Sequence, residues 1–186
     1  MASDELLREL RSLFREMEER YDAAAADYGF GCAGCEENCC TIGFKHYTHL
    51  EHELLKAGLE ELPEERRTEL RDRSRAALSD PAGERAPCPL LDGGRCSLYA
   101  HRLMICRMHG VPYSMTNPRQ GQIEGDGCLR FRRLHEEPYV VRIDRTTLYR
   151  RFAELERQAL EEAHLATRPR PRSIPEMILE IEADRA

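Results

Sequence analysis

Four cysteines crowd into one short segment, GCAGCEENCC, which runs from Gly31 to Cys40. They are Cys32, Cys35, Cys39 and Cys40. Cys32 and Cys35 have the C-x2-C spacing at which two thiolates hold one metal ion or cluster from either side of a tight turn. Gly31 and Gly34 supply the backbone freedom that such a turn requires. The segment therefore predicts a metal centre around which the rest of the fold is arranged.

The chain has eight cysteines in all. The other four are Cys88, Cys96, Cys106 and Cys128. The N-terminal sequence MASDELLREL is acidic and lacks the basic and apolar regions of a secretory signal, and no apolar stretch is long enough to span a membrane. We therefore expect a cytoplasmic protein without membrane association, in which thiols stay reduced and hold metal rather than form disulfides. All eight cysteines are predicted metal ligands.

Cys39 and Cys40 are adjacent, which poses a geometric question. Neighbouring side chains of an extended chain point to opposite faces, so the two thiols share one centre only where the backbone bends. Eight thiols can make two four-thiolate sites, one cluster with four spectators, or a bridged polynuclear centre. The sequence leaves these open, and we favour division of the pair between two centres.

Composition limits the class of protein. The formal net charge is −6, from 28 basic and 34 acidic residues, which argues against a nucleic-acid partner. A length of 186 residues suits one domain, predicted to span 1–186 with a metal-binding core at about 30–135 between helical flanks. Tryptophan is absent and aromatic residues are 6%, so the core must depend on leucine, alanine and whatever the cysteines organise.

Apolar residues recur at helical spacing in several segments, which predicts a mainly α-helical fold. The predicted helices run from Asp4 to about Tyr28, from Thr48, after Pro63, from Asp144 and from Ser173. Thr48 with Glu51, and Ser173 with Glu176, have the form of N-terminal capping boxes. The basic segment RPRPR at 168–172 is interpreted as a solvated linker. The expected architecture is helices packed around a cysteine-rich metal-binding centre.

A small β-hairpin is the main exception to this helical pattern. The segments VPYSMT and GQIEG read as strands on either side of a turn at NPRQ. Cys106 precedes this hairpin and Cys128 follows it. Because the two ends of a hairpin lie next to each other, the Cys106 and Cys128 thiols could lie close together. Cys88 and Cys96 likewise flank the turn LLDGGR.

Zinc and iron–sulfur clusters both accept four thiolates. Cys88–Pro89 echoes the Cys-Pro that ends bacterial ferredoxin motifs, and the irregular cysteine spacings differ from the paired C-x2-C units of a zinc ribbon. We therefore favour an iron–sulfur centre and keep zinc as the alternative. Four thiolates leave about −2 charge at either centre. Four nearby arginines could offset it: Arg95, Arg102, Arg107 and Arg130.

The segments CAGCEENCC and CPLLDGGRCSLYAHRLMICR resemble the YkgJ-type cysteine-cluster family, whose CxxCxxxCC domains are described as zinc- or iron-chelating. The residues that match its pattern are Cys32, Cys35, Cys39, Cys40, Cys88, Pro89, Leu91, Cys96, Tyr99, Arg102, Cys106 and Arg107, with Cys128 in place of a final cysteine. Leu103 stands where the family has proline, and no cysteine closely follows Cys106. The resemblance, which covers Gly31 to Cys128, implies metal binding. A related cluster in flagellin lysine methylases resembles a 4Fe–4S site and further favours iron.

Three hypotheses for function follow. The preferred one is a cytosolic protein that binds an iron–sulfur centre, of 4Fe–4S type, in a structural, electron-transfer or redox role. The second is a zinc-stabilised structural or interaction module with an unknown protein partner. The third is a metalloenzyme, or an accessory subunit of a modifying enzyme, in which an open coordination position or His109 does chemistry. Nucleotide-binding loops and hydrolase motifs are absent from the sequence, and catalytic residues are not assigned.

Several side chains outside the cysteine set are candidates to support the centre. His101 and His109 flank Cys106, while Tyr99 and Arg102 share a helical face from which they can contact the ligands. A second group comprises His46, His49 and His52, which are three residues apart. Histidines at the start of a helix are more often exposed or capping, so this group is the weaker candidate.

Overall fold

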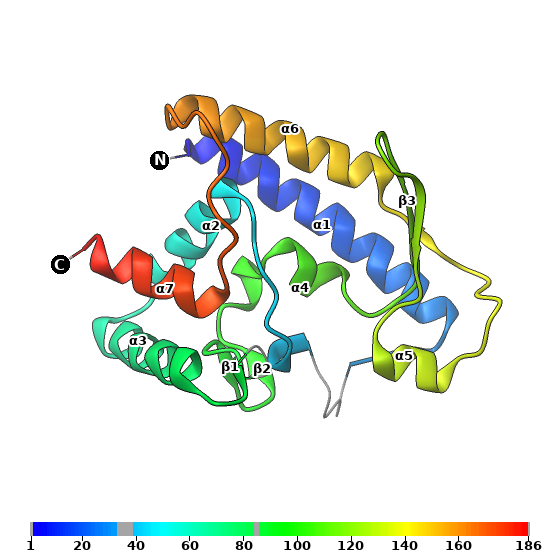
Figure 1. Cartoon of the computed structure of the whole chain (residues 1–186), viewed down its shortest axis with the longest axis horizontal. Helices are drawn as coiled ribbons and strands as arrows, with labels where there is room; N and C mark the ends of the chain where they lie inside the picture. Colours follow the sequence, from blue (N-terminus) through cyan, green and yellow to red (C-terminus); the bar gives the residue numbers. More distant parts are fainter. Residues whose placement is uncertain (1, 33–38, 84–85, 186) are drawn as a thin grey trace.

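A computed structural model describes residues 2–32, 39–83 and 86–185 of the chain (Figure 1). Seven α-helices lie in these ranges: α1 Asp4–Asp27, α2 His49–Glu60, α3 Glu64–Ser79, α4 Met104–Met108, α5 Leu129–Leu134, α6 Thr146–Glu162 and α7 Ile174–Ala183. Short 3-10 helices cover Cys39–Thr41 (η1) and Tyr99–His101 (η3). The predicted mainly α-helical fold is confirmed. None of the described helices combines the length and apolar character needed to cross a membrane.

The two longest helices, α1 and α6, lie side by side and form one layer, with α4 beneath α1 (Figure 1). α1 begins at the predicted place because the Ser3 hydroxyl accepts a hydrogen bond from the Leu6 amide. Its apolar face is buried, and the rings of Phe14 and Phe152 lie 5.8 Å apart between the two helices. This layer forms the first hydrophobic core.

A second core lies among α2, α3 and α7. One half of the predicted capping box is present at the start of α2, and the complete capping box is present at the start of α7. The Thr48 hydroxyl accepts from the Glu51 amide at the start of α2. At the start of α7, Ser173 and Glu176 cap each other's backbone amides. Because α3 and α7 pack along each other, the C-terminal helix closes the core opposite α1 and α6 (Figure 1).

Two small sheets complete the fold. Their strands are β1 Leu91–Asp92, β2 Arg95–Cys96, β3 Tyr113–Asn117, β4 Gly121–Gly125 and β5 Ile143–Asp144. The antiparallel β3–β4 pair is the predicted hairpin, closed at Asn117 and Gly121. β5 was not predicted; it pairs in parallel with β3, so the helix expected from Asp144 begins instead at Thr146.

The basic segment at 168–172 is exposed over most of its length, as the predicted solvated linker would be, but its last residue, Arg172, is buried. Arg172 is 8% exposed, and its backbone exchanges two hydrogen bonds with that of His46, at 2.7 and 3.0 Å. Its guanidinium pairs with Glu180 at 2.8 Å. The segment is therefore tied to the chain just before α2, and it holds α7 in place beside the cysteine region.

Candidate metal centre

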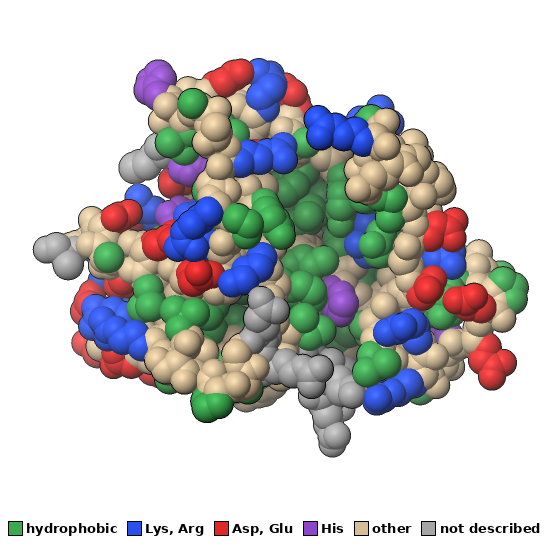
Figure 2. Space-filling model, viewed as in Figure 1, with side chains coloured by type: hydrophobic (Ala, Val, Ile, Leu, Met, Phe, Trp, Pro, Cys, Tyr) green, Lys and Arg blue, Asp and Glu red, His purple; other side chains and the backbone are tan. Residues whose placement is uncertain are grey.

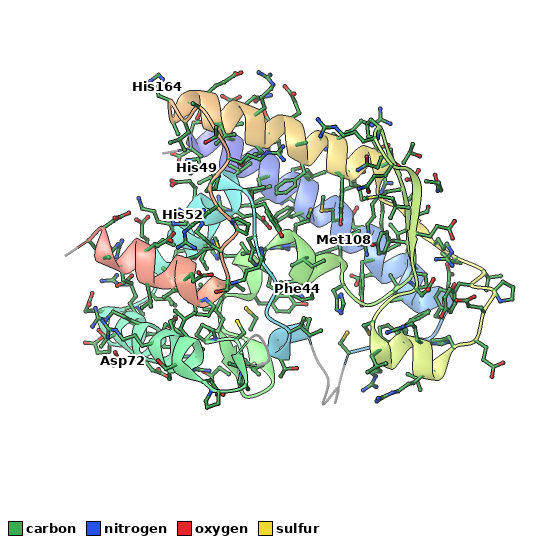
Figure 3. All side chains as sticks on the ribbon, viewed as in Figure 1. Phe44, His49, His52, Asp72, Met108 and His164 are labelled. Carbon is green, nitrogen blue, oxygen red and sulfur yellow. The ribbon has the colours of Figure 1, made fainter. Side chains whose placement is uncertain are left out.

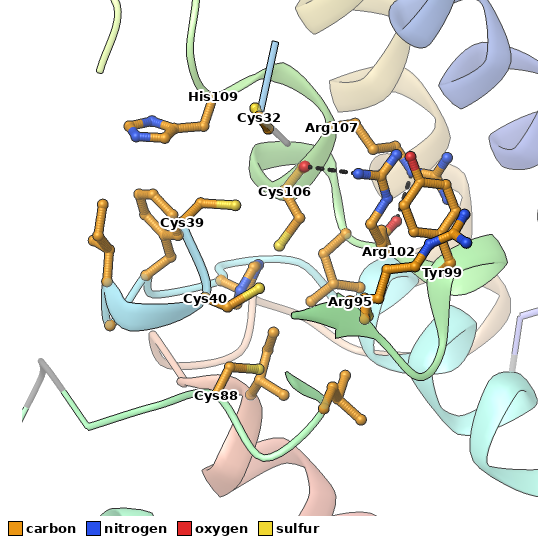
Figure 4. Close-up of a pocket in the computed structure, with 18 of the residues that line it drawn as sticks. Cys32, Cys39, Cys40, Cys88, Arg95, Tyr99, Arg102, Cys106, Arg107 and His109 are labelled. Carbon is orange, nitrogen blue, oxygen red and sulfur yellow. Dashed lines mark hydrogen bonds between the residues drawn. The ribbon is translucent and has the colours of Figure 1, made fainter. Parts of the chain in front are cut away.

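A cavity of about 990 Å³ opens between the two cores. Figure 2 shows a hollow in the middle of one face, where hydrophobic side chains, with cysteine counted among them, gather. Six of the cysteines that the structure describes line the cavity: Cys32, Cys39, Cys40, Cys88, Cys96 and Cys106. Figure 4 shows five of these thiols and the segments that carry them. Cys35 lies outside the described residues. The fold thus gathers cysteines from both sequence blocks into one place.

The η1 turn decides how the adjacent cysteines are presented. Cys39 and Cys40 begin this single turn of 3-10 helix, and both line the same cavity. The backbone is therefore bent in the way that sharing one centre requires, and the favoured division of the pair between two centres stays a prediction. The Cys40 carbonyl also accepts a hydrogen bond of 2.7 Å from the Cys88 amide, which joins the two cysteine blocks.

A tight hairpin brings Cys88 and Cys96 together. In the β1–β2 pair Leu91 lies opposite Cys96, and the turn is made by Gly93 and Gly94 at φ values of 53° and 81°. Such a turn favours glycine at both positions because L side chains rarely adopt positive φ. The Leu91 amide donates to the Cys88 carbonyl at 2.9 Å, which closes the loop from Cys88 back to the strand.

Backbone amides point at two of these sulfur atoms. The Cys88 thiol accepts a hydrogen bond from the backbone of Leu90, and the Cys96 thiol accepts one from the backbone of Leu98. Each contact lowers the pKa of its thiol, because a hydrogen bond donated to sulfur favours the charged form. The loops are therefore built to support thiolates, which are the form that binds metal.

Despite these amides, the pKa values of four thiols are raised. A hydrogen bond with Cys40, followed by burial, raises the pKa of Cys39. Burial raises the pKa of Cys106, and the charges of Cys39, Cys88 and Cys96 raise it further. Burial is also the largest cause of the raised pKa of Cys96. In the same way, burial raises the pKa of Cys88 to about 12.

The mutual effect of these thiols on their pKa values indicates what kind of group they can bind. Thiols that raise one another's pKa would repel strongly as thiolates, so the group needs a positive charge at its centre to ionise. A zinc ion or an iron–sulfur core supplies such a charge and accepts thiolate ligands. The charge interactions of Cys39, Cys88, Cys96 and Cys106 therefore suit a thiolate-bound metal centre.

Two arginines next to the centre carry positive charge. Arg102 and Arg107 both line the cavity, and both lower the pKa of Cys96. Glu18 on α1 accepts from both, at 2.6 and 2.7 Å, and the Arg102 guanidinium lies 3.7 Å from the centroid of the Tyr99 ring. These contacts fix the charge in place. The prediction that Tyr99 and Arg102 support the centre agrees with this geometry.

The sequence is matched by a family model described as "CxxCxxCC: Putative zinc- or iron-chelating domain", over residues 31–129, more than half of the chain. The chain belongs to this family. The range contains all eight cysteines, and the cavity is lined by residues of this range together with residues of α1 and of the start of α7. No curated protein and no solved structure matches the chain.

The chelating domain has a second, smaller group of thiols. The Tyr21 hydroxyl lies 3.8 Å from the Cys32 sulfur, and burial followed by the charges of Cys32, Cys128 and Cys39 raises the pKa of Tyr21. Cys128 is not among the described residues that line the cavity, and its sulfur accepts a hydrogen bond of 3.4 Å from the Phe131 amide as the N-cap of α5. Its predicted role as a ligand stays a prediction.

The hairpin does not bring Cys128 to Cys106 in the way that its returning ends suggested. Cys106 lines the cavity and packs against the second core, whereas Cys128 packs against the first core. The Cys128 amide instead donates to the Gly110 carbonyl at 2.9 Å. The ends of the β3–β4 hairpin thus meet through backbone, and the two thiols face different neighbours.

Histidines also reach the cavity of the chelating domain. His109 lines it, and its ring lies 5.1 Å from the ring of Phe44, which forms another part of the wall. The His109 Nε2 atom is buried and has no hydrogen-bond partner in the described part of the chain. Burial, followed by the charge of Arg145, lowers the pKa of His109. A neutral imidazole with an unpartnered nitrogen at the cavity is available to a bound group.

Glu18 and Tyr21 are site residues that the sequence analysis missed. Both lie on α1, where helical spacing alone assigns Tyr21 to the core face and Glu18 to the charged surface. Their spacing of three residues places them on one side of the helix, next to the point where the chain enters the cysteine segment. That position was the available signal.

Proposed function

We propose that this domain binds an iron–sulfur cluster of the 4Fe–4S type in the cavity, with Cys39, Cys88, Cys96 and Cys106 as its primary ligands. The observation that carries the proposal is that these four thiols line one cavity, and the raised pKa values that they share support it. Cys32, Cys35, Cys40 and Cys128 stay predicted ligands, of this centre or of a second one beside it.

Room and charge favour a cluster over a single zinc ion. A structural zinc site is closed tightly, with sulfur atoms about 2.3 Å from the ion. A cavity of about 990 Å³ lined by six cysteines has more space than one ion and four thiolates occupy. Amide hydrogen bonds to sulfur and nearby positive charge are also the means by which proteins tune iron–sulfur clusters. Leu90, Leu98, Arg102 and Arg107 supply these features here.

An iron–sulfur cluster supplies one-electron transfer when it is bound. The chain's own contribution is to hold negative charge: the amides of Leu90 and Leu98 stabilise thiolates, and Arg102 and Arg107 offset the remaining charge. A structural, electron-transfer or redox role follows from this arrangement. A cytoplasmic location and a protein partner for electron exchange belong to the same proposal.

Anaerobic purification tests the proposal directly. We expect a brown protein that absorbs broadly near 400 nm and contains iron and acid-labile sulfide in roughly equal amounts, about four of each per cluster. A colourless protein that holds stoichiometric zinc would overturn it. Cys106→Ser should reduce iron and sulfide content together. Cys128→Ser decides the role of a cysteine outside the cavity lining: unchanged iron and sulfide content would remove Cys128 from the ligand set, and lower content would keep it there.

A further inference from the structure

Three metal-ligating side chains gather on the first two turns of α2, apart from the cysteines. They are His49, His52 and Glu53, and one donor atom from each lies within 4.8 Å of the other two. None of the three is among the described residues that line the cysteine cavity. Figure 3 places His49 and His52 between the end of α6 and α7, away from Phe44, which lies in the cavity wall.

Helical geometry brings these side chains to one face. His49, His52 and Glu53 stand at positions i, i+3 and i+4, which are neighbours on a helix surface. Glu53 Oε1 lies 3.9 Å from His49 Nε2 and 3.8 Å from His52 Nδ1. The side chains are 14%, 12% and 10% exposed for His49, His52 and Glu53 respectively. The group is therefore mostly removed from solvent.

An ion pair alone does not account for this group. The contacts of 3.8 and 3.9 Å are longer than hydrogen bonds. The Nε2 atoms of His49 and His52 are both buried, and neither has a hydrogen-bond partner in the described part of the chain. Buried polar atoms are normally satisfied, because leaving them unpaired costs free energy. His49 presents its unpartnered Nε2 to the Glu53 carboxylate and His52 presents its Nδ1, an arrangement that indicates a ligand that accepts lone pairs from both rings.

The backbone beneath the group is held firmly. Glu156 of α6 is fully buried, and its carboxylate accepts from the amides of His49 and Leu50, at 2.8 and 2.9 Å. The Thr48 hydroxyl accepts from the Glu51 amide in the same turn. These contacts satisfy the amides at the start of α2, so the three donor side chains stand on a fixed helical turn.

The charge states also suit a cation. Burial lowers the pKa of His49, and the charge of Glu53 only partly opposes this effect. The charge of His52 lowers the pKa of His49 further, so its imidazole is neutral near pH 7. Burial opposes ionisation of Glu53, but its histidine neighbours and Lys56 lower its pKa overall. Two imidazoles and one carboxylate are a donor set that zinc accepts. The positive charges of Lys56 and Arg172 beside the group limit its affinity.

We propose that His49, His52 and Glu53 bind a divalent transition-metal ion of the zinc type, at a site separate from the cysteine centre. Zinc binds histidine nitrogen and carboxylate oxygen at about 2.0–2.2 Å, so tetrahedral ligands lie ~3.3 Å apart. The donor atoms lie within 4.8 Å of one another, so no pair is more than about 1.5 Å beyond this spacing. Three protein ligands leave a coordination position for water, which makes the ion exchangeable.

The test uses the anaerobically purified protein with its cysteine centre loaded. Zinc bound beyond the metal content of the isolated protein is measured by equilibrium dialysis and metal analysis. Wild type should bind one such zinc per chain. His49→Ala/His52→Ala and Glu53→Gln should weaken its binding by at least ~10-fold, the loss that even indirect ligand contacts produce. His164→Ala removes an exposed histidine at the end of α6 and should bind like wild type.

Further measurements separate this site from the thiols and from misfolding. Cobalt bound in place of the added zinc should show visible ligand-field bands without new thiolate-to-cobalt charge-transfer absorption. The variants' circular dichroism and their cysteine-centre metal content should match wild type. The proposal is overturned if wild type binds no added zinc, if the double variant binds it equally well, or if the cobalt spectrum shows thiolate ligation.

Discussion

The amide of Cys88 donates a 2.7 Å hydrogen bond to the carbonyl of Cys40, and this contact joins the two cysteine blocks of the sequence. Cys40 belongs to the η1 turn that precedes α2, while Cys88 lies in the connection between α3 and β1. The chain therefore leaves the cavity after Cys40, forms α2 and α3, and returns to the cavity at Cys88. Because the contact uses backbone atoms, it leaves both thiols available to the cavity.

Removing the metal should strongly destabilise the fold. Binding of a structural metal through thiolates contributes about 10–16 kcal/mol in small zinc domains, while a whole domain is stable by about 5–15 kcal/mol. We therefore expect chelation under anaerobic conditions to lower the free energy of unfolding by several kcal/mol, as measured by urea denaturation followed by circular dichroism. Restoring the metal should recover the midpoint. Equal midpoints with and without metal would show that the cavity forms independently of its ligand.

Cys35→Ser should lower metal content and melting temperature together. Cys35 lies outside the described residues, so this prediction rests on the C-x2-C spacing with Cys32. Serine preserves the size of the side chain but replaces the thiolate, so Cys35→Ala should behave in the same way. Metal analysis and thermal unfolding check both variants. Unchanged metal stoichiometry would remove Cys35 from the ligand set.

Arg102→Ala should lower the reduction potential of the proposed cluster. Arg102 lowers the pKa of Cys39 and Cys96, so its positive charge favours added negative charge at the centre. Its loss disfavours reduction, and we expect a shift on the order of tens of millivolts in a titration followed by electron paramagnetic resonance. Arg170→Ala also removes one positive charge, but from an exposed pair with Glu176, and should leave the potential unchanged. Equal shifts in the two variants would contradict a local effect.

Gly58→Ala should destabilise the protein, although alanine favours helices by about 0.8–1.0 kcal/mol. Gly58 faces His101, and an added Cβ would lie 2.7 Å from His101 Cγ and 2.9 Å from His101 Cβ. These atoms are close to the η3 backbone, so relieving the overlap requires shifts that cost about 1–3 kcal/mol. We expect a net loss of ~1 kcal/mol in urea denaturation.

The background variant His101→Ala provides the control for this prediction. In that background the contacts with His101 Cγ and Nδ1 are removed and only the 2.9 Å contact with Cβ remains, so Gly58→Ala should cost clearly less stability than it does in the wild type. If Gly58→Ala stabilises the protein in the wild-type background, then α2 and η3 can move apart enough to relieve the overlap without a loss of free energy of unfolding.

Local patterns in the sequence determined most of the secondary structure. Helical periodicity predicted α1, and the capping residues Thr48 and Ser173 marked where α2 and α7 begin, because capping depends on contacts within one turn. The β3–β4 hairpin followed from its turn residues. The cysteine spacings also identified the metal-binding class, since ligand type and spacing are local properties of the chain.

Contacts between distant residues were decided only by the tertiary structure. Three examples are the parallel pairing of β5 with β3, the burial of Arg172 and the approach of Glu18 to Arg102. Each joins segments that are distant in the sequence, and the local sequence of one segment does not predict its contact with the other. The same holds for the thiols: sequence supplied eight candidates, but the bend at η1 turned Cys39 and Cys40 to one cavity. Which thiols share a centre depends on backbone direction at a few turns, and that direction is fixed by packing of the two cores around them.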